Sequence, residues 1–175
     1  MLRDEIDGLR QRLADRGRPV VQWLRPGLDV AVAGSGLFGN LPPELREWFE
    51  AWNGVVEASE QTIGDVSVVP GYWPVSWDEG LALRADLAPD PALGDLWFPL
   101  LSNGASDAYA LVWDVHGATT VAGVLVGEPT QIEFLSVEGM VRFFNRCYDE
   151  AAFVVNDSGH LEMDVPVYER LYADT

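Results

Sequence analysis

The stretch between residues 97 and 135 constrains the fold most, because it offers four strands with no room for a helix between any two of them. The candidate strands are residues 97–101, 109–113, 119–126 and 130–135, rich in β-branched and aromatic side chains and separated by short turns that contain glycine. Parallel neighbours need a crossover of about a dozen residues or more, whereas antiparallel neighbours need only a turn. This stretch therefore predicts an antiparallel meander.

Two helices with aromatic faces are expected to cover this sheet. Residues 41–54 begin with Leu-Pro-Pro and end with Asn-Gly, and their apolar residues recur at the spacing of one helical face: Leu45, Trp48, Phe49 and Trp52. Asn40 is the expected cap of this helix. After the sheet, Ser136 is the expected cap of a second helix whose buried face carries Met140, Phe143, Phe144 and Cys147.

The remaining segments add shorter elements. We expect helices over residues 2–16, from Ser76 with Glu79 completing a capping box, and from Pro166, together with a hairpin over residues 153–163. Weaker patterns predict short strands at residues 29–32 and 65–69 and an irregular connection at residues 70–74. These elements predict a single α+β domain that consists of an antiparallel meander sheet with helices packed mainly on one side. Residues 1–36 are interpreted as an amino-terminal helix and loop extension, and residues 37–175 as the α+β domain.

The charge distribution favours some partners and excludes others. The chain has 28 acidic residues against 11 basic ones, all of them arginine, and a formal net charge of −17. Four arginines and 22 acidic residues lie beyond residue 46, which places a formal charge of −18 in that part of the chain. Such a surface repels a nucleic-acid backbone and attracts a basic protein.

Several further classes are excluded. The amino end is charged from its third residue and lacks a signal-peptide pattern, and no segment has the ~20 apolar residues of a membrane span. With Cys147 as the only cysteine, an internal disulfide is impossible. We therefore expect a cytoplasmic protein without membrane contact.

Three segments together resemble a known family. They are the helix of residues 41–54, with its Leu41-Pro42 start and Asn53-Gly54 end; residues 97–109, Trp-Phe-Pro-Leu-Leu-Ser-Asn-Gly-Ala-Ser-Asp-Ala-Tyr; and the serine-capped helix of residues 136–144. In order and spacing over about residues 37–150, they resemble the SUKH superfamily, which includes fungal cell-wall-synthesis regulators and bacterial immunity proteins that neutralise polymorphic toxins. The resemblance implies a noncatalytic protein-binding module, either an immunity protein or a regulatory binding protein.

Aromatic residues beside a Pro-Gly loop are the expected anchors for such a partner. Tyr72, Trp73 and Trp77 lie in or next to this loop among acidic residues, and aromatic rings are favoured at protein interfaces. We expect them to bind a protein, possibly a basic toxin domain, together with acidic residues of the sheet region: Asp107, Asp114 and Glu128.

The alternative is a small hydrolytic or ligand-binding enzyme that uses those same three carboxylates. The sequence supports it weakly, since Cys147 falls on an apolar helical face and no Gly-x-Ser-x-Gly elbow is present. Asp114 and His116 have the spacing of a metal pair but lack a third ligand. We therefore expect no enzyme activity, no cofactor and no metal.

Overall fold

The computed structural model describes residues 1–30, 38–87 and 90–174 and contains a five-stranded antiparallel sheet with the strand order β1-β2-β3-β4-β5. Its strands are β1 (Trp73–Pro74), β2 (Trp97–Ser102), β3 (Ala108–Trp113), β4 (Thr119–Val124) and β5 (Gln131–Phe134). The order in space is the order along the chain, which confirms the predicted meander. A separate hairpin pairs β6 (Phe153–Val155) with β7 (Leu161–Met163).

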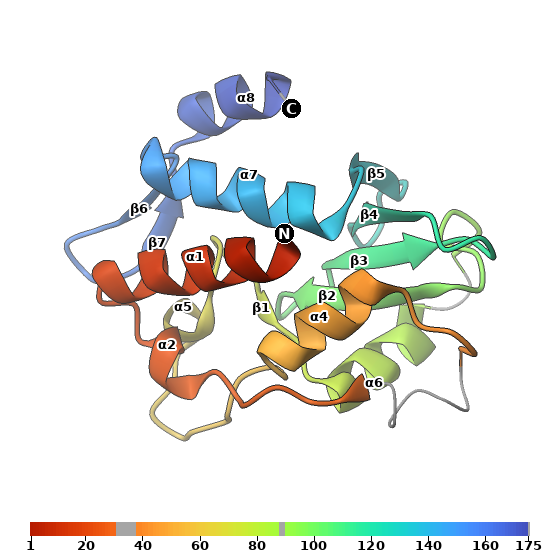
Figure 1. Ribbon diagram of the computed structural model, residues 1–175. Helices are drawn as coiled ribbons and strands as arrows, with labels where there is room; N and C mark the ends of the chain where they lie inside the picture. Colours follow the sequence, from red (N-terminus) through yellow and green to blue (C-terminus); the bar gives the residue numbers. More distant parts are fainter. Residues whose placement is uncertain (31–37, 88–89, 175) are drawn as a thin grey trace.

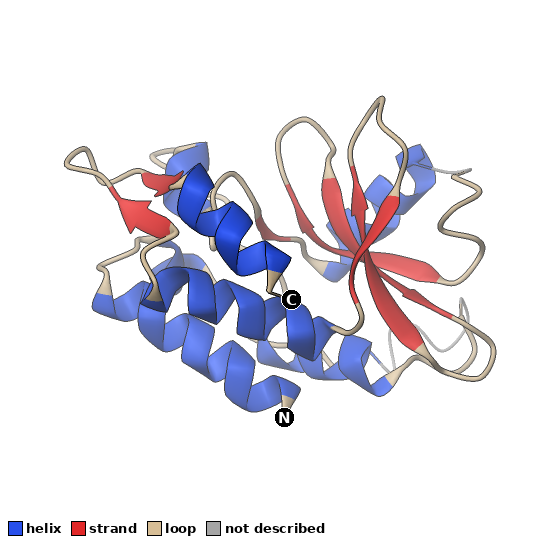
Figure 2. Cartoon of the chain, turned by 90° about the horizontal axis from the view of Figure 1, so that it is seen from above, coloured by secondary structure: helices blue, strands red, loops and turns tan. Residues whose placement is uncertain are grey.

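Helices lie above and below the sheet in Figure 1. They are α1 (Leu2–Asp15), α2 (Val20–Trp23), α4 (Pro43–Ala51), α5 (Ile63–Val66), α6 (Trp77–Leu87), α7 (Val137–Asp149) and α8 (Val165–Ala173). α1 runs beside α7, and α8 lies on the side of α7 away from α1 (Figure 1). Seen from above, the five-stranded sheet lies on one side of the molecule, and the helices at the two ends of the chain lie on the other together with the β6–β7 hairpin (Figure 2).

Alternate residues of β3 point into two different apolar clusters, as the two faces of a sheet require. Leu111 and Trp113 join the main core, which also contains buried residues of α1, α4 and α7. Ala108 and Ala110 face a smaller cluster, against which Leu83 and Leu87 of α6 pack. The predicted α+β class, with helices mainly on one side, is confirmed, and the second half of α6 covers part of the other side.

Two of the three predicted helix caps agree with the structure, and one does not. Ser136 caps α7 by accepting a hydrogen bond from the Gly139 amide at 2.9 Å, and Ser76 and Glu79 form the predicted capping box of α6. Asn40 does not cap α4, because the N-cap is Pro42 and has no side-chain bond. The two prolines supply the first-turn geometry without a donor that would need a cap.

Two other local predictions need correction. Residues 65–69 do not form a strand: Thr62 and Asp65 make a reciprocal capping box that begins the short helix α5. The connection at residues 70–74 is only partly irregular, since Trp73 and Pro74 pair with β2 as β1. Of the strand predicted at residues 29–32, Asp29 and Val30 are described and do not lie in a strand, whereas residues 31 and 32 and the predicted boundary at residues 36 and 37 lie outside the described residues. Among the described helices, none has the length and apolar character to span a bilayer.

Candidate functional site

The meander brings four of the six predicted binding residues to one end of the sheet. The β2–β3 turn at residues 103–107 and the β4–β5 turn at residues 125–130 both leave the sheet at this end, and β1 pairs with β2 here through Trp73 and Ser102. This places Tyr72, Trp73, Asp107 and Glu128 at the same end. We call this region the turn-end surface, defined by Glu57, Ile63, Trp73, Asp107, Leu125, Val126 and Glu128.

Helix α5 and strand β1 meet the β2–β3 turn directly. A methyl group built on Gly104 would lie 3.6 Å from Cδ1 of Ile63 and 3.8 Å from Cη2 of Trp73. These two side chains therefore flank the turn, and α5 lies close to β1 in Figure 1. Ile63 is 62% exposed and Trp73 is half-buried, so both present apolar surface to solvent.

Asp107 holds the two turns of this surface together. Its Oδ2 accepts a hydrogen bond from Nδ2 of Asn103 at 2.8 Å within its own turn, and its Oδ1 accepts one from the Val126 amide at 2.9 Å in the other turn. Both carboxylate oxygens are thus used in shaping the surface. Asp107 is a positioning residue here, which leaves Glu128 and Glu57 as the exposed carboxylates.

The turn-end surface combines exposed apolar side chains with a one-sided charge. Val126 is 62% exposed and Leu125 46% exposed, at the tip of the β4–β5 turn. The chain segments that form the surface contain several acidic residues, whereas no arginine or lysine occurs between residues 47 and 83 or between residues 85 and 141. Exposed apolar groups beside uncompensated carboxylates are suited to a basic protein partner with an apolar patch of its own.

The three predicted aromatic anchors lie in different environments. Tyr72 is half-buried and packs on Tyr109 with 5.1 Å between ring centroids, and burial raises the pKa of its phenol. Trp77 is only 3% exposed and stacks on Phe98, with centroids 4.4 Å apart and planes 12° from parallel. Trp77 is therefore a core residue at the start of α6, and Trp73 is the aromatic residue that borders a surface pocket.

Asp114 lies at the opposite end of the sheet, in the β3–β4 turn. Its Oδ1 accepts hydrogen bonds from the amides of Ala118 at 2.9 Å and His116 at 2.8 Å. These amides stabilise the carboxylate and lower the pKa of Asp114. Because the length of β3 separates Asp114 from Asp107, the structure does not bring the two together as a carboxylate pair.

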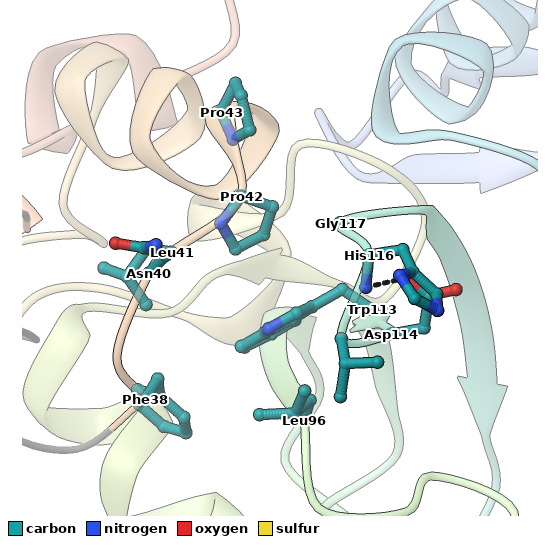
Figure 3. Close-up of a pocket in the computed structure, with 11 residues that line it drawn as sticks. Phe38, Asn40, Leu41, Pro42, Pro43, Leu96, Trp113, Asp114, His116 and Gly117 are labelled. Carbon is teal, nitrogen blue, oxygen red and sulfur yellow. Dashed lines mark hydrogen bonds between the residues drawn. The ribbon is translucent and has the colours of Figure 1, made fainter.

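The turn containing Asp114 borders a pocket of about 460 Å³. In Figure 3, the ring of Trp113 lies between Pro42 above it and Phe38 and Leu96 below it, and His116 lies beside Asp114. The only interaction drawn between these residues is the hydrogen bond between Asp114 and His116, which belongs to the turn itself. Most of the lining residues are apolar, and the carboxylate of Asp114 is occupied by amides of its own turn.

The structure also places the single cysteine and the potential metal ligands of its described residues. Cys147 is fully buried in α7, and burial raises the pKa of its thiol to about 12. Within residues 1–30, 38–87 and 90–174, no three His, Cys, Asp or Glu side chains are grouped so as to hold a metal ion.

The sequence analysis missed four members of the turn-end surface: Glu57, Ile63, Leu125 and Val126. Leu125 and Val126 were included in a predicted strand, although their position directly before Gly127, Glu128 and Pro129 indicates a turn. Ile63 belongs to a segment for which no helix was predicted, and its Thr-x-x-Asp start is the signal that could have revealed one.

Comparison with known proteins adds no relative, since neither the family models nor the curated proteins include a match to this chain.

Proposed function

We propose that this chain is a noncatalytic protein-binding module that docks a basic protein on its turn-end surface. The observation that carries the proposal is the exposure of Ile63, which flanks the β2–β3 turn together with Trp73, and of Val126 in the β4–β5 turn, each 62% exposed, on a surface whose segments contain only acidic charge. The carboxylates would speed encounter with a basic partner, and the apolar groups would hold the complex once water is excluded.

The resemblance to the SUKH superfamily supports a more specific form of this proposal. Its helix and turn motifs lie in α4, in β2 with the turn that follows, and in α7, all within the same packed core or its edge. On that resemblance, we propose that the chain acts in the cytoplasm as an immunity protein against a basic toxin domain. A regulatory binding protein would use the same surface, and its partner would be a host protein in place of a toxin.

The test uses capture from an extract of the native host with three forms of the chain. The surface variant carries Ile63→Ser and Val126→Ser, which remove exposed apolar groups without touching the core. The matched control carries Val115→Ser, because Val115 is 84% exposed at the opposite end of the sheet. We expect one basic protein to be retained by the wild type and the control and lost from the surface variant.

The immunity form has its own test. The identified partner, expressed alone in a heterologous bacterium, should arrest growth, and co-expression of the wild-type chain should restore it. If the surface variant retains every protein that the wild type retains, docking at the turn end is wrong. If the partner is harmless when expressed alone, the regulatory form replaces immunity.

A further inference from the structure

A pocket of about 330 Å³ opens on the turn-end surface between α5 and β1. Its apolar wall comes from Ile63, Val66 and Trp73, and its polar rim from Glu57, Gln61 and Thr62. The volume falls at the lower end of the range of about 300–1,000 Å³ that is usual for ligand pockets. It suits one long side chain better than a whole cofactor.

The rim has one charged group that is not used by the fold. Both polar atoms of the Gln61 side chain already have hydrogen-bond partners. Its Oε1 accepts a hydrogen bond from the Ala58 amide at 2.9 Å, and its Nε2 donates one to the Val56 carbonyl at 2.5 Å. Thr62 donates its hydroxyl to Asp65 at 2.8 Å. The carboxylate of Glu57 is exposed and makes no hydrogen bond or ion pair with another described residue. Among the described side chains of the rim, the pocket therefore offers one available acceptor, and that acceptor is anionic.

A buried arginine lies beside α5, and its hydrogen bonds go to backbone carbonyls and not to Glu57. Arg18 is 3% exposed, and its guanidinium donates to backbone carbonyls, including that of Gly159 at 2.7 Å and that of Gly64. Hydrogen bonds from Thr62 lower the pKa of Asp65, and the charge of Arg18 adds to this effect. A cation that enters from solvent thus meets Glu57 and the ring of Trp73 before the buried guanidinium of Arg18.

We propose that this pocket binds an arginine side chain of the docked protein. The guanidinium stacks on the indole of Trp73 and pairs with Glu57, while the methylene groups of the arginine lie against Ile63. Arginine fits this role better than lysine, because its guanidinium is planar, weakly hydrated and able to stack on an aromatic face while it pairs with a carboxylate. This inference rests on the proposed function, for which it names the side chain that the surface recognises.

The test follows the indole N–H signals of the intact ¹⁵N-labelled chain by NMR as N-acetyl-arginine amide is added. The Trp73 signal is assigned from its absence in Trp73→Phe. The uncharged isostere N-acetyl-citrulline amide is the ligand control. We expect the arginine compound to shift the Trp73 signal in a saturable way and the citrulline compound to leave it in place.

Paired variants separate a specific contact from the general acidity of the surface. Glu57→Gln removes the pocket carboxylate, and Glu128→Gln removes one exposed charge of the same surface outside the pocket. We expect Glu57→Gln to weaken binding of the arginine compound about two- to fivefold, as for an exposed ion pair, and Glu128→Gln to weaken it less.

Equal shifts with the arginine and citrulline compounds, or equal losses in the two variants, would overturn the arginine pocket. Neither result would affect the capture experiment, which depends on Ile63 and Val126 and decides the docking proposal by itself.

Discussion

Replacing Gly54 with alanine tests how tightly α4 is joined to α6. Gly54 follows α4 with φ +76°, a region that disfavours any side chain with a Cβ. A Cβ at this position would lie 2.6 Å from the Ser76 nitrogen and 2.9 Å from the Ser76 Cα. Ser76 cannot retreat easily, because its amide donates to Glu79 at 2.7 Å and the next amide, that of Trp77, donates to Asn53 at 2.7 Å.

The expected loss of stability has two parts. The left-handed backbone conformation costs a non-glycine residue roughly 1–2 kcal/mol. Displacing a backbone that is already packed adds about 1–3 kcal/mol. The free energy of unfolding should therefore fall by roughly 2–5 kcal/mol, a large share of the 5–15 kcal/mol that is typical of a domain.

Gly117 provides the matched control. Its φ is +84°, yet a Cβ built on it would meet no atom within 4 Å. Gly117→Ala should therefore lose only the backbone part, roughly 1–2 kcal/mol. Urea denaturation followed by tryptophan fluorescence measures both variants against the wild type. If Gly54→Ala is no less stable than Gly117→Ala, the close contact between the end of α4 and the start of α6 is not present in solution.

Three further outcomes can be checked with the same purified protein. Arg18→Lys should lower the free energy of unfolding by about 1.5–3 kcal/mol in urea, because one ammonium cannot replace a guanidinium that donates to several carbonyls, and an unchanged midpoint would contradict this. The thiol of Cys147, whose pKa is raised to about 12, should resist dithionitrobenzoate at pH 8 until denaturant is added, so rapid labelling of the native protein would count against its burial. Arg12 holds the pKa of Asp149 below the usual 3.8. The stability that this pair contributes is fully present above pH 3.8 and is lost as the pH falls through the lowered pKa. Asp149→Asn should therefore flatten the acid limb of a plot of unfolding free energy against pH.

The elements that could be predicted from the sequence are those fixed by local chemistry. Ser136 and Ser76 cap their helices with their own side chains, and the spacing of Leu45, Trp48 and Phe49 places one face of α4 in the core. The short turns of the meander leave only antiparallel pairing between neighbours. Each of these features depends on residues within a few positions of one another.

The features that could not be predicted depend on contacts between distant parts of the chain. Trp77 is buried because Phe98 packs closely over Gly80, where a Cβ would lie 2.4 Å from Cε1 of the phenylalanine ring. No local pattern around Trp77 shows this contact. The strand predicted at residues 65–69 overlaps the end of the short helix α5, because the alternation that begins at Asp65 suggests a strand whereas the capping box of Thr62 and Asp65 decides the conformation.

In the candidate site, too, the residue types could be predicted from the sequence, whereas their arrangement in space could not. The residue types of the turn-end surface are visible in the sequence, since Trp73 follows a Pro-Gly loop and Asp107 lies in an Asn-Gly turn. Their proximity to Val126 is not visible, because it arises from the register of β2, β3 and β4 and from a hydrogen bond between residues 19 positions apart. The register also moves Asp114 to the other end of the sheet.

Hydrogen exchange of the chain alone and in complex with the captured partner tests the docking surface most directly. The account predicts slower exchange on binding in residues 57–66 and in the turns at residues 103–107 and 125–130, with no change at residues 114–118. Protection confined to residues 114–118 and the start of α4, with the three turn-end segments unchanged, would contradict it.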